Sequence, residues 1–359
     1  MANYGAIGMN WKRLILLQLN RHNAKQRYLV PIINKKLNNM NDRDSFRGTS
    51  IDEKFAKSFK ESLFFKKIYK EHKNEIIIGV RDSYINLYYN CDSIALIDVS
   101  NPKKCETNSY YTNNGKKCLT DVEFKNYYDT IKANSNKRDK LEKQAQQRLF
   151  IDNNNNSLSD WYCIDVEYTK SLKGKKTAED WRFDIIAISK EPPFRIAFIE
   201  LKYGNGALGG ASGIRTHVKD YYAFFKNNFY ESLLPEIVSI INKLIILGVD
   251  NIPCSLENIS CEQFAPVPEF YFITLNNNPE YPSEKTPKST MSGYLFGDKR
   301  WGCRRVSSLI NKEGDYFDLI EHDKSFKPVF LFSNSKLPDL RIPDILNKDY
   351  YDDVEIIEK

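Results

Sequence analysis

The sequence predicts a mixed α/β protein. Apolar residues recur at three- and four-residue spacing in several segments, short β-branched and aromatic runs lie between these segments, and the two kinds of segment alternate along the chain. The 359 residues are 41% hydrophobic and 28% charged, which supplies a sizeable core and excludes disorder of the whole chain. A chain of this length has room for two domains or one enlarged core.

The N-terminal third predicts helices followed by a β-hairpin. Amphipathic spacing predicts helices over residues 11–37 and 51–73. Strand patterns follow at residues 75–80, 84–89 and 94–99, and the polar residues 90–93 join the last two as a hairpin. We place a domain boundary in the polar segment 111–134, so that residues 1–133 form an N-terminal α+β region for recognition or partner binding.

The central segment predicts a helix, three strands, a helix and a further strand, with one extra helix before the last strand. In order, these elements are helix 134–151, strands 161–169, 182–189 and 195–202, helices 214–227 and 233–247, and strand 269–275. Residues 134–277 form the predicted core. Residues 278–359 form a C-terminal extension that packs on it, with strand patterns at 316–320 and 328–332.

Two predicted core strands carry acidic residues in an apolar context. The turn between them is centred at Pro192, and Asp184 and Glu200 are each eight residues from it. Antiparallel pairing therefore places these two residues opposite each other, with Cβ atoms about 4.5–5.5 Å apart. Lys202 points the same way as Glu200, because side chains two apart on a strand share a face.

Two carboxylates this close repel each other unless a cation lies between them. Burying such charges is costly unless they are paired or bind a metal. Oxygen ligands of this kind suit Mg²⁺ or Mn²⁺ rather than zinc. With Lys202 holding or deprotonating a water molecule, or stabilising charge on a phosphate, the group is typical of metal-dependent phosphodiester hydrolysis.

The segments 182–187, Arg-Phe-Asp-Ile-Ile-Ala, and 197–202, Ala-Phe-Ile-Glu-Leu-Lys, resemble the PD-(D/E)XK nuclease superfamily. Phe183 replaces the proline of the motif name. The resemblance covers about 140 residues and implies a restriction-endonuclease-like core. It also implies that Asp184, Glu200 and the Leu201 carbonyl bind Mg²⁺, that Mn²⁺ can substitute, and that Lys202 is the catalytic lysine. Many members add a glutamate from the first helix, for which Glu142 is the candidate.

The resemblance thus implies a Mg²⁺-dependent endonuclease and favours DNA over RNA, which the residues themselves do not distinguish. Two alternatives stay open: a catalytically inactive nucleic-acid-binding module with a nuclease fold, and an immunity effector nuclease activated by a ligand or a partner. The partners of the chain would be nucleic acid and, through the N-terminal half, a second copy or another protein.

Several neighbouring residues are candidates for nucleic-acid binding. They lie in the basic loop before Asp184 and on the helix after the glycine-rich segment 204–213: Lys173, Lys175, Lys176, Arg215, His217 and Lys219. His217 lies at the border of the apolar stripe, so a structural role is the alternative reading. Glu167 is either a further metal ligand or a solvated edge charge.

Charge and cysteine usage complete the prediction. The first 50 residues carry a net +7, which suggests a polyanion partner or a solvated helix face. Seven cysteines without a C-x-x-C pair indicate a reducing, cytoplasmic location. No apolar run is long enough to cross a bilayer, so we expect a soluble protein without membrane contact.

Overall fold

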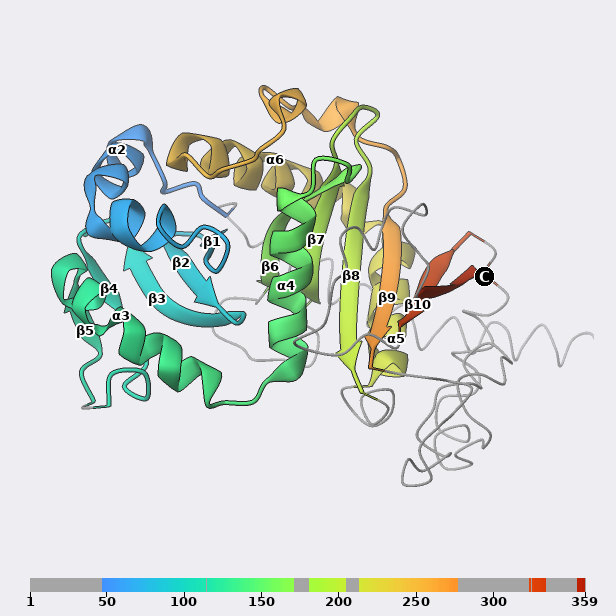
Figure 1. Cartoon of the computed structure of the whole chain (residues 1–359). Helices are drawn as coiled ribbons and strands as arrows, with labels where there is room; N and C mark the ends of the chain where they lie inside the picture. The colour runs from blue at the N-terminus through green and yellow to red at the C-terminus, as the bar shows by residue number, and fades with distance from the viewer. Residues whose placement is uncertain are drawn as a thin grey trace, which may run out of the picture. The chain divides into compact units, whose positions relative to one another are not determined.

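The computed structural model describes residues 47–113, 115–170, 181–204, 213–276, 323, 325–333 and 354–358. This part of the chain forms two β-sheets with helices packed on them, in agreement with the predicted α/β class (Figure 1). Among its helices, none combines the length and apolar character that crossing a membrane requires. The helices predicted over 11–37 and the strand predicted over 316–320 lie outside the described residues.

The first sheet is antiparallel and contains the predicted hairpin. Its strands in spatial order are β1 (Ile77–Val80), β2 (Tyr84–Tyr89), β3 (Asp92–Asp98), β4 (Lys104–Glu106) and β5 (Cys118–Thr120). Asn90 and Cys91 form a two-residue turn between β2 and β3, with φ values of 53° and 50°. Positive φ at both central residues is what a tight hairpin turn requires, and asparagine tolerates it well.

Helices flank this sheet, and one of them was not predicted. The α-helix α2 (Glu53–Glu61) and the π-helix η1 (Phe64–Tyr69) fall within the helical segment predicted at 51–73. The helix α3 (Asp121–Asn136), however, occupies the segment predicted to be a polar linker. It begins with a capping box between Thr120 and Glu123, which satisfies two of the free N–H groups at its start.

The second sheet has six strands of mixed direction. Its elements are β6 (Trp161–Lys170), β7 (Trp181–Ser189), β8 (Ile196–Tyr203), β9 (Glu269–Leu275), β10 (Pro328–Ser333) and β11 (Val354–Glu358), in the spatial order β11-β10-β9-β8-β7-β6. β6, β7 and β8 pair antiparallel, β8, β9 and β10 pair parallel, and β11 closes the edge antiparallel. The strands predicted at these positions are confirmed, except that β11 was not predicted.

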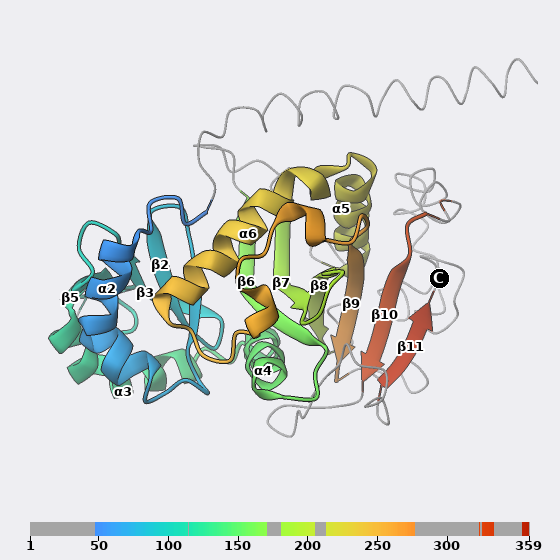
Figure 2. The same ribbon diagram turned by 90° about the horizontal axis from the view of Figure 1, so that it is seen from above.

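Helices cover both faces of the second sheet. α4 (Leu141–Asn155) lies on one face, and α5 (Ile214–Lys226) and α6 (Phe229–Leu247) lie on the other (Figure 2). These two helices form the crossover that parallel β8 and β9 require. α4 begins seven residues later than predicted, because the segment before it belongs to α3. α6 begins four residues earlier, because Pro235 lies inside the helix and not at its first turn.

A buried ion network joins the two sheets. Arg81, which follows β1, places Nη1 2.8 Å from Oδ1 of Asp165 on β6. Arg47 Nη1 lies 3.2 Å from Asp165 Oδ2, and its Nε lies 3.3 Å from Oε1 of Glu236 on α6. Two arginines and two carboxylates cancel in formal charge, which is the condition for keeping such groups out of water.

Candidate active site

The register of β7 and β8 places Asp184 and Glu200 at the same level. The paired residues run from Ile188↔Ile196 to Ile185↔Ile199, which confirms the register predicted from the turn. The next position in this register is Asp184 opposite Glu200. The backbone ladder stops one residue short of it, and there the Leu201 N–H donates to Asp184 Oδ2 at 2.8 Å.

The strand β7 departs from strict alternation at Asp184. Ile185 packs in the core cluster that contains Ala145 and Leu149 of α4. Phe183 instead stacks on Phe198, with ring centroids 4.3 Å apart, in the aromatic layer under α5. Residues two apart on a regular strand share a face. The chain therefore changes face at Asp184, which lies between two packed layers.

The neighbouring strand β6 is irregular as well. Its pairing with β7 shifts between Cys163 and Asp165, so its side chains do not alternate regularly between the two faces of the sheet. Val166↔Ile185 and Tyr168↔Phe183 are paired, which places Glu167 level with Asp184. Glu167 has φ 52°, a left-handed conformation that is uncommon for a residue other than glycine.

Glu200 is enclosed by polar side chains from β8 and α5. Lys202 Nζ lies 2.6 Å from Glu200 Oε1 and 3.5 Å from Oε1 of Glu142 on α4. His217 Nε2 lies 3.1 Å from the same Glu200 oxygen, and Tyr221 donates its hydroxyl to Glu200 Oε2 at 3.2 Å. Glu200 Oε1 is buried and accepts no hydrogen bond from the described residues, although the Lys202 ammonium and the His217 ring lie close to it.

Tyr221 is a site residue that the sequence did not single out. Its ring packs against Phe183, Phe270 and Phe272, as expected of an apolar-stripe residue. Its hydroxyl nevertheless reaches Glu200, one helical turn after His217. The four-residue spacing of a histidine and a tyrosine on α5 is the sequence signal that could have indicated this pair.

The electrostatics reflect crowded carboxylates. Burial raises the pKa of Glu200 to about 7, with Lys202 opposing and Glu142 reinforcing the rise. Burial and the adjacent Glu200 raise the pKa of Asp184 well above its usual range, although its side chain keeps some exposure to solvent. Burial lowers the pKa of Lys202, but the carboxylates of Glu200, Asp184 and Glu142 outweigh it and raise the pKa overall.

A second lysine holds Glu167. Lys143 on α4 places Nζ 3.2 Å from Glu167 Oε1 and donates to the Cys91 carbonyl at 3.1 Å. Glu167 is therefore an ion-paired residue beside Asp184. Of the two readings that the sequence left open for it, the edge charge matches its place on the edge strand β6 and its partial exposure, with Lys143 as an ion-pair partner, and a role as metal ligand stays a prediction.

The donor set suits a hard divalent cation. Among the described side chains, four carboxylates and two lysines gather here, a formal charge of −2 that one divalent ion would balance. Within the same residues, no three His, Cys, Asp or Glu side chains are placed to bind one ion together. Mg²⁺ is bound through one or two carboxylates with water completing its shell, so Asp184 and Glu200 fit this ion and not zinc.

The remaining candidates are only partly described. Lys173, Lys175 and Lys176 lie outside the described residues. Arg215 lies in the first turn of α5, where the backbone alone is described, and Lys219 is half-buried one turn later. His217 is the one candidate of this group that the structure places against Glu200.

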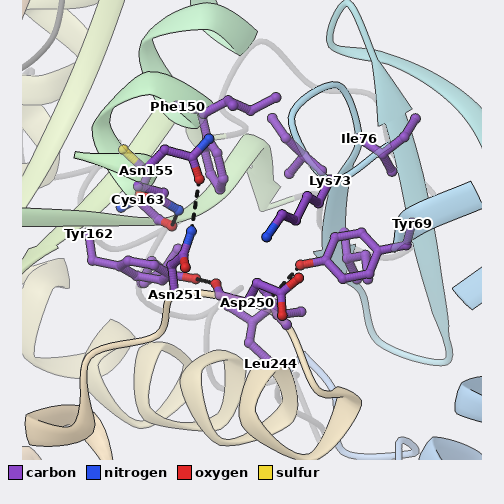
Figure 3. Close-up of a pocket in the computed structure, with 16 residues that line it drawn as sticks. Tyr69, Lys73, Ile76, Phe150, Asn155, Tyr162, Cys163, Leu244, Asp250 and Asn251 are labelled. Atoms are coloured by element: carbon purple, nitrogen blue, oxygen red, sulfur yellow. Dashed lines mark hydrogen bonds between the residues drawn. The ribbon is translucent and has the colours of Figure 1, made fainter. Parts of the chain in front are cut away.

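A separate small cavity lies away from these carboxylates. It has a volume of about 40 Å³, and apolar and polar residues from η1, β1, α4, β6, the end of α6 and the loop after it line its walls. Figure 3 shows Lys73 and Tyr69 reaching toward the loop at Asp250, whose N–H donates to the Tyr69 hydroxyl at 2.9 Å. A volume of this size accommodates a few water molecules.

Comparison of the chain with protein-family models, with curated proteins and with solved structures gives no match. Any functional conclusion for this chain therefore depends on the chemistry of the residues around Asp184 and Glu200.

Proposed function

We propose that the chain is a Mg²⁺-dependent endonuclease of the PD-(D/E)XK superfamily, with DNA favoured over RNA as its substrate. One observation carries the proposal: Asp184 and Glu200 come level one residue beyond the end of the β7–β8 pairing, with Lys202 Nζ 2.6 Å from Glu200 Oε1. The element order α4, β6, β7, β8, α5, α6 and β9 supports a restriction-endonuclease-like core over residues 134–277, with one added helix.

Each residue has a defined role in this proposal. Asp184, Glu200 and the Leu201 carbonyl would hold Mg²⁺ or Mn²⁺, which supplies an activated water and neutralises phosphate charge. Glu142 would accept a hydrogen bond from a water on the α4 side. Because three carboxylates raise the pKa of Lys202, its ammonium stays charged and would stabilise the charge that develops on the phosphate, in preference to acting as a base.

A catalytically inactive nucleic-acid-binding module is the second candidate. Lys202 already lies against Glu200, so the site is partly neutralised without a metal ion. Mg²⁺ or Mn²⁺ should stabilise the proposed enzyme, and Asp184→Ala should abolish this stabilisation. An inactive module should not be stabilised by either ion.

A cleavage assay tests the enzyme directly. Supercoiled, linear and single-stranded DNA and RNA are incubated with the full chain and Mg²⁺ or Mn²⁺, alongside Lys202→Ala and Asp184→Ala. We expect both substitutions to reduce cleavage at least about 100-fold, the scale of losing one electrostatic group in an active site. Cleavage by Lys202→Ala at the wild-type rate would remove the proposed mechanism.

A further inference from the structure

We infer that Lys143 binds a phosphate of the nucleic-acid backbone at the entrance of the site, and that Glu167 holds this lysine in place until the phosphate arrives. The inference rests on the proposed function and specifies how that site would bind a phosphate of its substrate. It adds a second lysine, carried by a helix, to the strand lysine Lys202.

The first step is the position of Lys143. Its ammonium contacts Glu167, and Glu167 is level with Asp184 in the register of β6 and β7. The Glu167 carboxylate is close enough to contribute to the raised pKa of Asp184, after burial and Glu200. One carboxylate thus separates Lys143 from the proposed cation ligand.

The second step is access from solvent. The side chains of Glu200 and Lys202 are only 2% and 7% exposed. Those of Lys143, Glu167 and Glu142 are 28%, 33% and 37% exposed. Solvent therefore reaches the described part of the site on the side of α4, and a polyanion that reaches Asp184 from that side comes close to Lys143.

The third step is charge. Four carboxylates repel a phosphodiester, so binding it requires cationic groups near the path to Asp184. Lys202 is buried against Glu200, whereas Lys143 is partly exposed and paired with a single carboxylate. Burial lowers the pKa of Lys143, but Glu167, Cys91 and Asp92 together outweigh it and the pKa is raised, so the lysine is charged at neutral pH.

The fourth step is that the surrounding backbone fixes the positions of Lys143 and Glu167. The backbone of Glu167 is in the left-handed region, which residues other than glycine rarely adopt. On the other side, the hairpin turn of the first sheet fixes Lys143 through the Cys91 carbonyl. The backbone of β6 in the second sheet therefore positions Glu167, and the hairpin turn of the first sheet positions Lys143.

The test measures binding without cleavage. The full chain is titrated against fluorescein-labelled 30-base-pair duplexes of DNA and of RNA, with Ca²⁺ in place of Mg²⁺ and KCl varied from about 50 to 300 mM. Lys143→Gln should weaken binding about 5- to 10-fold and reduce the slope of log Kd against log salt by about one. Glu167→Gln should tighten binding about 3-fold, because it removes a competitor for Lys143.

Matched variants separate this role from a structural one. Lys70→Gln removes a similar surface lysine, paired with Asp250 beside the cavity of Figure 3, and should change Kd less than about 2-fold. Lys143→Arg keeps the charge and should retain the wild-type slope.

Each outcome decides the inference. An unchanged salt slope in Lys143→Gln, or a loss of affinity equal to that of Lys70→Gln, would overturn it while leaving the proposed nuclease intact. Lowered thermal stability with an unchanged slope would show that Lys143 only tethers the hairpin. Absence of binding to either duplex by the wild-type chain would reject the proposed function itself.

Discussion

Glu200 is the residue whose chemistry most depends on its surroundings. It is almost fully buried, yet it has Lys202, His217 and Tyr221 within 3.2 Å. The burial penalty exceeds the effect of these partners, and the pKa rises to about 7. At neutral pH and without a divalent cation, the carboxyl is therefore partly protonated, and a cation would favour the ionised form.

This pKa predicts how stability depends on pH in EDTA. An unfolded glutamate titrates near 4.3, so between about pH 4 and 7 the folded state binds more protons than the unfolded state. The free energy of unfolding should therefore fall as the pH rises through this window, by at most about 4 kcal/mol from Glu200. Asp184 acts in the same direction, because its pKa is also raised.

Urea unfolding at pH 5, 6, 7 and 8 measures this dependence. Glu200→Gln should flatten the profile, because the amide does not titrate. A wild-type profile that rises with pH over the same range, or one that Glu200→Gln leaves unaltered, contradicts the account of Glu200.

At this scale, the sequence predicted the residues whose positions depend on strand spacing alone. Asp184, Glu200 and Lys202 followed from counting outward from a turn, and the register confirmed the count. Lys143 and Tyr221 were not predicted as members of the site. Their positions depend on how α4 and α5 rotate against the sheet, which sequence periodicity does not specify to within one side chain.

At the scale of elements, the departures from regular strands coincide with the site. A strict two-residue period would give β6 one buried and one polar face, but the shifted pairing after Cys163 and the left-handed Glu167 alter both faces. β7 changes face at Asp184. Such irregularities cost pairing energy and are concentrated near functional sites, and a period of two cannot reveal them.

The helix α3, which the sequence analysis did not predict, has an N-terminal capping box whose contribution to stability can be tested. Thr120 Oγ1 accepts from the Glu123 N–H at 3.3 Å, and the Glu123 carboxylate accepts from the Thr120 N–H at 2.8 Å. Thr120→Ala should lower the free energy of unfolding by about 1 kcal/mol in urea titrations. Thr130→Ala, inside the same helix, should change it by less than about 0.5 kcal/mol. Equal effects would show that the cap does not stabilise α3.

At the scale of the whole described molecule, the buried ion network predicts a strong dependence on Asp165. This carboxylate lies within 3.2 Å of both Arg47 and Arg81. Asp165→Asn would leave an excess of buried positive charge, which costs about 3–5 kcal/mol. By contrast, Asp152→Asn removes the partner of Arg148 on the exposed face of α4 and should cost under about 0.5 kcal/mol.

Urea unfolding of these two variants separates the possibilities. A loss below about 1 kcal/mol for Asp165→Asn would mean that the network does not join the two sheets energetically. The sequence did not predict this network, because its members come from four distant segments and their charges meet only in the folded chain.

The central claim is that Asp184 and Glu200 together hold one divalent cation. Titration calorimetry of the full chain with Mn²⁺ at pH 7.5 tests it most directly, with Asp184→Asn as the site variant and Asp152→Asn as the matched control. We expect one site in the wild-type chain, the same site in Asp152→Asn, and its loss in Asp184→Asn. Equal Mn²⁺ binding in all three proteins, or binding in none, would contradict the account.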